Sequence, residues 1–519
     1  MPSVEPETPQ SPSEGTTLSE RYLARLAKRS FLSLWSYANV YTDEGRRGGK
    51  GDGKELCDLL VVFGDDVLIF SDKHCDFPNT GQTALAWARW YRRAVQKSAR
   101  QVVGARNWIT RFPSRLYLDR ACHDCFPIAL PSPSELRFHL VAVTSGAYEA
   151  CRYHFQGHST GSLVVNTSVR GPDHERHPFT IGRVIPLGPY IHVLDEVTLN
   201  VVLREMDTVK DLVAYLERKE LLLTHPTRNV LATGEEQLVA WYLTKLDDSG
   251  NHNFTGLPED VDIVFIDEGH WEEFIRSPQY LAKKSADKPS YAWDHLIEHL
   301  TFRGEVGLGE DARRNLYEME PALRALASES RLARRQLAQQ LLEAIQKEVP
   351  PGQRFLRMGH TRQSPETAYV FLILPHPPFV KTYAEYREGR RAMLLASCKV
   401  ARLRAPSAHK IVGIATEPAG TGGASEDLVW LDVHDEPWGA EEQDEAQNLQ
   451  REAGILLDEN VLVYEKHDNE YPEPSIVPLF GSPSSRLLER KRLENFERLA
   501  KKQIRKKSKQ GPPQPPGDG

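Results

Sequence analysis

Cysteine is scarce in this chain, which has 6 among its 519 residues. A disulfide framework requires a far higher density of cysteine, so we expect free thiols. The sequence also lacks any run of about 18 apolar residues, and no membrane-spanning helix is expected. The first residues lack the basic and apolar segments of a secretory signal. We therefore expect a cytoplasmic protein that does not engage a membrane.

The chain also lacks an overall basic charge, because its formal net charge is −7. This excludes a protein that coats nucleic acid with a uniformly positive surface. The charges are nevertheless segregated: Lys501 to Lys509 is strongly basic and Asp432 to Glu445 is strongly acidic. A basic segment of this kind suits either nucleic acid or solvent, and both interpretations stay open.

Length and local composition predict a multi-domain α+β protein. The chain ends are rich in proline with serine or glycine, which is typical of disorder. The expected segments are a disordered N-terminus (1–16), an N-terminal α+β domain (17–150), a mixed, mainly helical region (151–350), a second α+β unit (351–480), and a basic helix with a disordered tail (481–519).

The stretch from Gly48 to Lys73 organises the N-terminal domain. Its two apolar runs, Leu59 to Phe63 and Val67 to Phe70, are separated by a Gly/Asp turn. Short apolar runs that flank such a turn predict a β-hairpin. A helix over Ser19 to Leu34 is expected before the hairpin.

Charged residues cluster at the open end of this hairpin. Glu55 and Asp58 stand where the first strand begins, and Asp72 and Lys73 stand where the second strand stops. Because neighbouring strands lie about 5 Å apart, these side chains are expected to meet. Carboxylates beside a lysine are suited to a hard cation next to a phosphate.

A long helix is expected from Gln82 to Thr110, followed by a buried strand from Phe138 to Val143. The predicted order is therefore helix, strand, strand, helix, strand within a typical domain length. The polar positions of the long helix carry basic residues that we expect to bind nucleic acid. These are Arg89, Arg93, Lys97 and Arg100.

The segment Gly53-Lys54-Glu55, the strand that starts at Cys57-Asp58, and the ending Ser71-Asp72-Lys73 resemble the PD-(D/E)xK nuclease superfamily. The similarity is greatest to its Mrr-like and NERD-like branches and covers roughly residues 18–145. It implies a restriction-endonuclease-like αβββαβ core. It further implies that Asp58 binds metal, that Lys73 lies beside the attacked phosphate, and that Glu55 is an additional upstream glutamate.

Two features depart from that pattern. The family has three consecutive strands, of which the sequence clearly indicates two. The second acid of the family stands two residues before the lysine, where this chain has Ser71. Asp72 points to the opposite face in a regular strand. Either a bulge turns Asp72 inward, or Glu55 replaces the missing acid, or the site binds without cutting.

These observations favour a Mg²⁺- or Mn²⁺-dependent nuclease that hydrolyses phosphodiester bonds in DNA. Asp58, Glu55 and Asp72 are the expected metal ligands, and Lys73 and Asp58 are the expected catalytic residues. The alternative is a degenerate nuclease fold that serves as a nucleic-acid or protein interaction module. The choice between DNA and RNA and the oligomeric state stay open.

A second enzyme alternative rests on His295-Leu296-Ile297-Glu298-His299. This formal H-x-x-E-H resembles the zinc motif of pitrilysin-type peptidases, in which two histidines on one helix face bind zinc and the glutamate acts as a base. Few positions of the motif are fixed, and ordinary partly exposed histidines are the commoner explanation. We rank a metallopeptidase below a nuclease.

Cysteine and histidine also pair at zinc-like spacing in Cys122-x-x-Cys125 and Cys151-x-x-His154. The two halves are further apart than in compact zinc fingers, so free cysteines are favoured and zinc is not expected.

The remaining chain offers elements without a recognisable catalytic motif. The expected elements are helices over Pro321 to Lys347, Thr382 to Leu403, Glu441 to Leu456 and Ser485 to Lys507, and strands over Tyr369 to Leu374, Lys410 to Ala415, Asp427 to Asp432 and Val461 to Tyr464.

Overall fold

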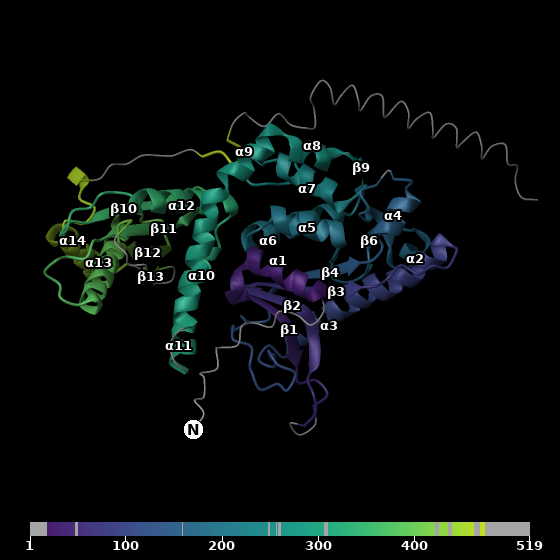
Figure 1. The fold of residues 1–519 in the computed structure, drawn as a ribbon, viewed down its shortest axis with the longest axis horizontal. Coiled ribbons are helices and arrows are strands. Elements are labelled where there is room, and N and C mark those ends of the chain that lie inside the picture. The colour runs from purple at the N-terminus through teal and green to yellow at the C-terminus, as the bar shows by residue number, and fades with distance from the viewer. Residues whose placement is uncertain are drawn as a thin grey trace, which may run out of the picture.

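The computed structural model has a mixed α+β fold, and within its described residues the strands form three sheets (Figure 1). The described residues are 18–46, 50–157, 159–247, 250–255, 257, 261–305, 310–420, 425–433, 438–460 and 468–472. The expected disordered N-terminus (1–16), the strand Val461 to Tyr464 and the basic helix Ser485 to Lys507 lie outside them. Over the described part of the chain, no helix is both long enough and apolar enough to span a bilayer.

The N-terminal sheet has five strands in the order β1-β2-β3-β4-β7. The strands are β1 (Ser36–Thr42), β2 (Lys54–Phe63), β3 (Asp66–His74), β4 (Arg137–Ser145) and β7 (Ile191–Leu194). The expected hairpin is confirmed as β2 and β3, which pair antiparallel. β3, β4 and β7 run parallel. β7 comes from beyond residue 150, so this sheet extends past the limit expected for the N-terminal domain.

Helices cover both faces of this sheet. α1 (Leu18–Trp35) packs on one face, where Trp35 meets Phe63 edge to face at 5.1 Å between ring centroids. The other face carries α2 (Thr83–Tyr91), a π-helical turn (Arg92–Gln96) and α3 (Lys97–Arg111), which together confirm the expected long helix.

β1 is the strand that the sequence pattern did not indicate. It is nearly buried throughout and follows α1 without an intervening turn residue. Burial on both faces removes the alternation of apolar and polar residues by which a strand is usually recognised. The resulting element order, α1-β1-β2-β3-α3-β4, places three consecutive strands between the two helices.

The middle of the chain builds a second sheet with the order β6-β5-β8-β9, together with a series of helices. Its elements are α4 (Tyr148–His154), β5 (Val164–Arg170), β6 (Thr180–Arg183), α5 (Glu196–Glu205), α6 (Val209–Leu223), β8 (Asn229–Ala232), α7 (Glu235–Thr244), β9 (Ile263–Ile266), α8 (His270–Arg276), α9 (Pro278–Ala286) and α10 (Tyr291–Glu305). α5 and α6 share the core of the N-terminal sheet, on the face that α1 covers.

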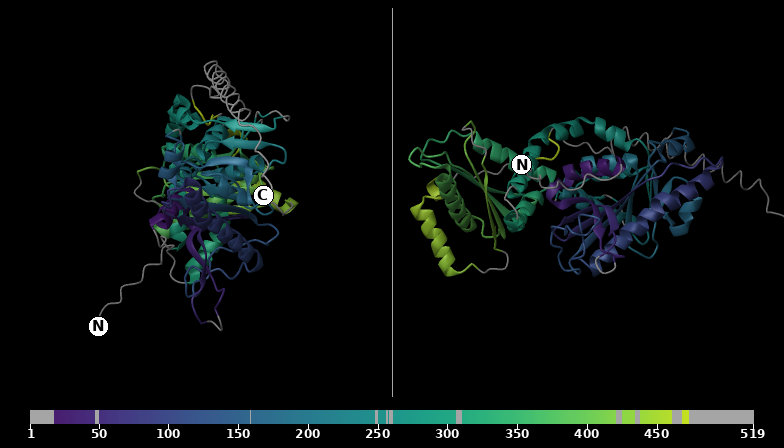
Figure 2. Two further views of the ribbon diagram at one scale, coloured as in Figure 1. Left: turned by 90° about the vertical axis from the view of Figure 1, so that its right-hand side faces the viewer. Right: turned by 60° about the horizontal axis from the view of Figure 1, so that its bottom comes forward.

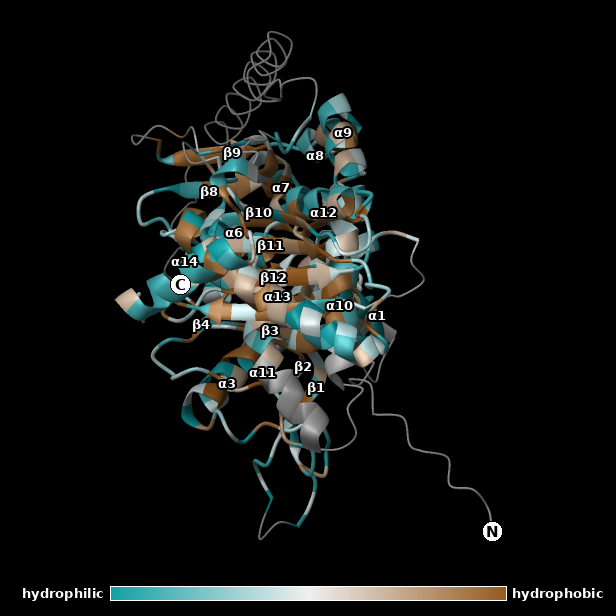
Figure 3. Ribbon diagram, turned by 90° about the vertical axis from the view of Figure 1, so that its left-hand side faces the viewer, coloured by the Kyte–Doolittle hydropathy of each residue, from teal (hydrophilic) through white to brown (hydrophobic). Residues whose placement is uncertain are grey.

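The third sheet has the order β10-β11-β12-β13, and its apolar strands β11 and β12 stand out in Figure 3. The elements are α11 (Glu310–Ala327), α12 (Arg331–Ile345), β10 (Phe355–Thr361), β11 (Ser364–Ile373), α13 (Tyr383–Arg404), β12 (Lys410–Thr416), β13 (Asp427–Asp432) and α14 (Ala440–Glu452). α13 links the parallel strands β11 and β12, and α13 and α14 lie on one side of the sheet (Figure 2).

Two helix predictions in this region are wrong in extent. The single helix expected over Pro321 to Lys347 is broken into α11 and α12. Ser330 has extended backbone and caps α12 by accepting the backbone N–H of Ala333, which starts a new helix. The acidic helix expected to reach Leu456 ends at Glu452.

Candidate functional site

Asp58 lies where the β2–β3 hairpin opens. The pairing of the two strands ends at Leu59 and Phe70, and β2 contains an irregularity in its register with β1 just before Asp58. The Asp58 side chain enters this opening, where one carboxylate oxygen accepts the backbone N–H of Asp72 at 2.5 Å. In a regular pair of strands a backbone carbonyl of β2 would accept this N–H, and here the Asp58 carboxylate takes its place.

Lys73 reaches the same carboxylate oxygen, with 3.4 Å between its Nζ and Asp58 Oδ2. The Asp58 side chain is almost fully buried, whereas that of Lys73 is 25% exposed. Burial raises the pKa of Asp58 above its ordinary value, and the charge of Lys73 opposes that rise. The structure therefore brings together the two residues that the sequence assigned to catalysis.

Ser71 and Asp72 point to opposite faces of the sheet, as the strand alternation predicts. Ser71 Oγ lies 3.2 Å from Ser98 Oγ and 3.0 Å from Gln101 Oε1, both on α3. Asp72 faces α1, where its carboxylate is hydrogen-bonded to the side chain of Ser19. No bulge turns Asp72 towards the face of Ser71.

Asp72 nevertheless belongs to the same electrostatic cluster as Asp58. Burial, with a contribution from the nearby charges of Asp58 and Glu20, raises the pKa of Asp72 to about 6. The pKa of Glu55 is raised as well, first by incomplete solvation and then by Asp58. Burial is the main cause of the raised pKa in each case, and neighbouring carboxylates add to it.

Glu20 is a member of the cluster that the sequence did not single out. It lies in the first turn of α1, and its charge contributes to the raised pKa values of Glu55, Asp58 and Asp72. An acid at a helix start is usually interpreted as a response to the helix dipole, which conceals any other role. Only the packing of α1 against β3 places it here.

The carboxylates of this cluster do not converge on a single point. In the part of the chain that the structure describes, one group alone brings three ligand atoms within 4.8 Å of one another, and it consists of Asp66, His139 and Glu217. Glu55, Asp58 and Asp72 are therefore neighbours with their carboxylates spread over a wider area.

The four basic residues expected to bind nucleic acid form one stripe along α2, the π-helical turn and α3. All four are exposed, and none makes an ion pair with another described residue, although Arg92 beside them pairs with Glu175 at 3.5 Å. The stripe consists of Arg89, Arg93, Lys97 and Arg100. The last two directly precede Ser98 and Gln101, the residues that contact Ser71, so the stripe passes the level of the cluster.

The H-x-x-E-H residues on α10 do not face one site. His295 and His299 line a cavity of about 300 Å³, and His299 Nε2 lies 3.0 Å from Glu426. Glu298 instead accepts the backbone N–H of Ser33 on α1 at 2.6 Å. The glutamate that a metallopeptidase would use as its base thus serves to join two helices.

The candidate zinc cysteines have separate surroundings. All six cysteines are free thiols. Cys122 Sγ contacts the carbonyl oxygen of Thr42, whereas Cys151 is buried and its Sγ contacts the carbonyl oxygen of Ser162. This arrangement agrees with the interpretation of these residues as free cysteines in the core or in loops.

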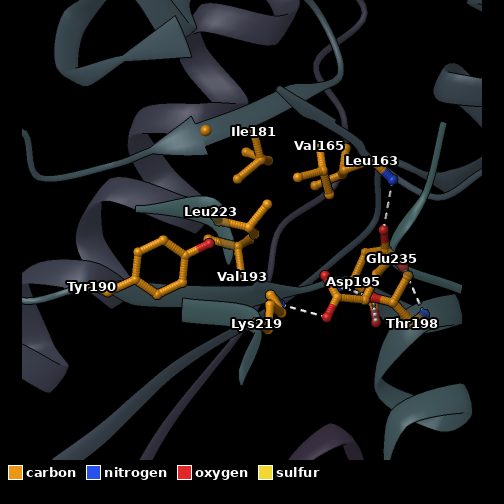
Figure 4. Close-up of a pocket in the computed structure, with 11 residues that line it drawn as sticks. Leu163, Val165, Ile181, Tyr190, Val193, Asp195, Thr198, Lys219, Leu223 and Glu235 are labelled. Carbon is orange, nitrogen blue, oxygen red and sulfur yellow. Dashed lines mark hydrogen bonds and ion pairs between the residues drawn. The ribbon is translucent and has the colours of Figure 1, made fainter. Parts of the chain in front are cut away.

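A second, smaller cavity of about 20 Å³ lies between β5, β6, β7 and α6 (Figure 4). Lys219 and Glu235 form a buried ion pair at its edge, and Asp195 caps α5 by accepting the backbone N–H groups of Val197 and Thr198. A volume of this size holds about one water molecule, which excludes the cavity as a substrate site.

Comparisons with known proteins do not connect this chain to any of them, since no family model, no curated protein and no solved structure matches it.

Proposed function

We propose that this protein is a metal-dependent nuclease that hydrolyses phosphodiester bonds, with DNA as its substrate. The observation that carries the proposal is the contact of Lys73 with Asp58, at 3.4 Å. This contact lies within a group of carboxylates that outnumber the nearby basic side chains. The order α1-β1-β2-β3-α3-β4 supports it, because it is the order that the resemblance to PD-(D/E)xK nucleases implies.

The oxygen donors of the cluster are of the type that a hard divalent cation prefers, although they are spread more widely than the ligands of a single ion. Asp58, Glu55 and Asp72 offer oxygen ligands, which Mg²⁺ and Mn²⁺ prefer. Their raised pKa values reflect burial first and the neighbouring carboxylates second, and a bound cation would oppose both effects. A bound cation would lower the pKa of its water and polarise the phosphate.

The protein's own groups divide the remaining work. The Lys73 ammonium stabilises negative charge that develops on the phosphate. Asp58 orients Lys73 through their ion pair and, by accepting the Asp72 N–H, keeps the hairpin open at this point. The exposed stripe from Arg89 to Arg100 attracts the phosphate backbone and positions the duplex, because its charges are unpaired.

A specific observation favours a second candidate, a nuclease-like fold that binds nucleic acid without cutting it. Ser71 occupies the position of the second acid and its hydroxyl contacts α3, while Asp72 faces α1. If a carboxylate on the face of Ser71 is indispensable, this arrangement supports binding through the basic stripe alone.

The experiment compares cleavage of linear, circular and single-stranded DNA in Mg²⁺, in Mn²⁺ and in EDTA. Wild-type protein is tested beside Asp58→Asn and Lys73→Ala. The matched control is Asp65→Asn, which removes an exposed carboxylate from the closed end of the same hairpin. We expect metal-dependent cutting that falls by at least about 10³-fold in the two site variants and is unchanged in the control.

The result also separates the two candidates. Salt-dependent DNA binding without cutting in any metal would support the binding module. Cutting that persists in both Asp58→Asn and Lys73→Ala would show that the proposed active site is wrong.

A further inference from the structure

The closed end of the N-terminal sheet carries a second group of ligating side chains, at the opposite end of β3 from Lys73. Asp66 begins β3, His139 lies on β4 and Glu217 lies on α6. Their ligand atoms all lie within 4.8 Å of one another, and His139 Nε2 is 3.0 Å from Asp66 Oδ1. Two ligands of a tetrahedral zinc ion are about 3.3 Å apart, so this spacing suits a shared ion.

His192 supplies an independent observation. It lies on β7, one strand from His139, and its exposed fraction is 1%. Neither ring nitrogen has a hydrogen-bond partner among the residues that the structure describes, and Nε2 is 4.0 Å from Glu220, one turn beyond Glu217 on α6. Buried polar groups are rarely left without a partner, and one that is requires an explanation such as an unseen ion.

Arg137 already binds Asp66 and lies near Glu217, with 4.0 Å between its Nε and Glu217 Oε1. Its Nη2 is 2.7 Å from Asp66 Oδ2 and its Nε is 3.0 Å from Asp66 Oδ1. A carboxylate has about four acceptor positions, of which the guanidinium uses two. Arg137 then acts as the outer partner that fixes the orientation of the ligand, as is usual around metal ligands. An ion at this site would lie beside the Asp66 oxygen that His139 Nε2 contacts at 3.0 Å.

We propose that Asp66, His139 and Glu217 bind a zinc ion, with His192 and Glu220 facing the same ion from β7 and α6. Two imidazoles with carboxylates are a ligand set typical of divalent transition metals, in contrast with the all-oxygen cluster around Asp58. The ion would join the starts of the parallel strands to α6, so it stabilises the fold. It is distinct from the proposed nuclease site and does not depend on it.

The test titrates chelator-treated full-length protein with Zn²⁺ by calorimetry and repeats the measurement on Glu217→Gln and His192→Ala. Glu217 is about half exposed, so its isosteric replacement leaves folding intact. The control for loss of an exposed carboxylate is Glu149→Gln on α4. We expect one equivalent of Zn²⁺, an affinity at least about tenfold weaker in both site variants, and no change in the control.

Two further arms separate this site from the cysteine pairs and from the Asp58 cluster. The variants Cys122→Ser and Asp58→Asn are expected to bind Zn²⁺ as the wild type does. Co²⁺ in place of Zn²⁺ is expected to give visible absorption without a thiolate charge-transfer band. Unchanged affinity in Glu217→Gln and His192→Ala, or a thiolate band with Co²⁺, would overturn the proposal.

Discussion

Two regions of this protein bury charged side chains, and they differ in how those charges are balanced. On α12, Arg331, Arg334 and Arg335 are buried and each contacts a carboxylate. The single carboxylate of Asp294 binds both Arg331, at 2.8 Å, and Arg334, at 2.7 Å. At the open end of the β2–β3 hairpin, by contrast, several carboxylates gather around Lys73.

The difference separates buried charges that are paired with opposite charges from carboxylates that gather around one lysine. Burial acts to raise the pKa of Asp207, but the charge of Arg331 beside it holds that pKa below its ordinary value. The acids near Lys73 have raised pKa values instead, as Asp58 and Asp72 show. An excess of carboxylates over nearby cations favours the binding of a counter-ion.

The largest expected effect is on the matched network. Asp294→Ala leaves Arg331 and Arg334 buried without their shared carboxylate, and we expect the free energy of unfolding to fall by about 3–5 kcal/mol. Urea denaturation measures the loss, with Asp65→Ala as the exposed control. A loss below about 1 kcal/mol would show that the two arginines find other partners and would remove the contrast between the regions.

The same type of change at the hairpin is expected to have the opposite sign. In EDTA at pH 7, Asp72→Asn should stabilise the fold by roughly 1–3 kcal/mol, because the native pKa of Asp72 is about 6 and its ordinary value is 3.8. The native state therefore binds more protons than the unfolded state between about pH 4 and 6. Wild-type stability should fall as the pH rises through this window.

Denaturation curves at pH 4, 5, 6 and 7 test this dependence. We expect the gain from Asp72→Asn to vanish at pH 4, where Asp72 is protonated in the folded protein. Adding Mg²⁺ or Mn²⁺ at pH 7 should reduce the gain, since a cation relieves the same repulsion. A variant that is less stable than the wild type at every pH would contradict the interpretation of this cluster as an excess of charge.

A smaller effect is expected from the basic stripe. The double variant Lys97→Ala/Arg100→Ala removes two unpaired charges, and we expect the dependence of log K on log salt to become shallower by about 2. Fluorescence titration of duplex DNA at several salt concentrations measures this slope. The matched control is Arg92→Ala, because Arg92 lies on the same helix and is paired with Glu175. An equal change of slope in Arg92→Ala would show that binding depends on overall positive charge and not on the stripe.

The smallest effect is expected at an exposed ion pair. Lys54→Ala removes a partner of Glu44 at 2.8 Å, and both side chains are at least half exposed. Such pairs contribute about 0–1 kcal/mol, so the midpoint of urea denaturation should hardly move. A loss as large as that in Asp294→Ala would show that burial does not separate the two kinds of charge pair.

The elements predicted well are those whose local pattern survives folding. The hairpin of β2 and β3, the long basic helix and β4 have apolar runs or helical spacing that any tertiary context preserves. β1 was missed because a strand buried on both faces has no alternation. The break between α11 and α12 was missed because Ser330 is a weak signal inside a sequence rich in helix formers.

The sequence by itself determined that Asp58 and Lys73 meet at the open end of the hairpin. The alternation of side chains along a strand and the tight turn leave the two strands no other register. The sequence also determined that Ser71 and Asp72 face opposite ways. Tertiary packing alone decided that Glu20 joins the cluster from α1, and that Asp66, His139 and Glu217 meet at the other end. Those residues come from elements far apart in the chain, and no local rule of spacing relates side chains that only a packed core brings together.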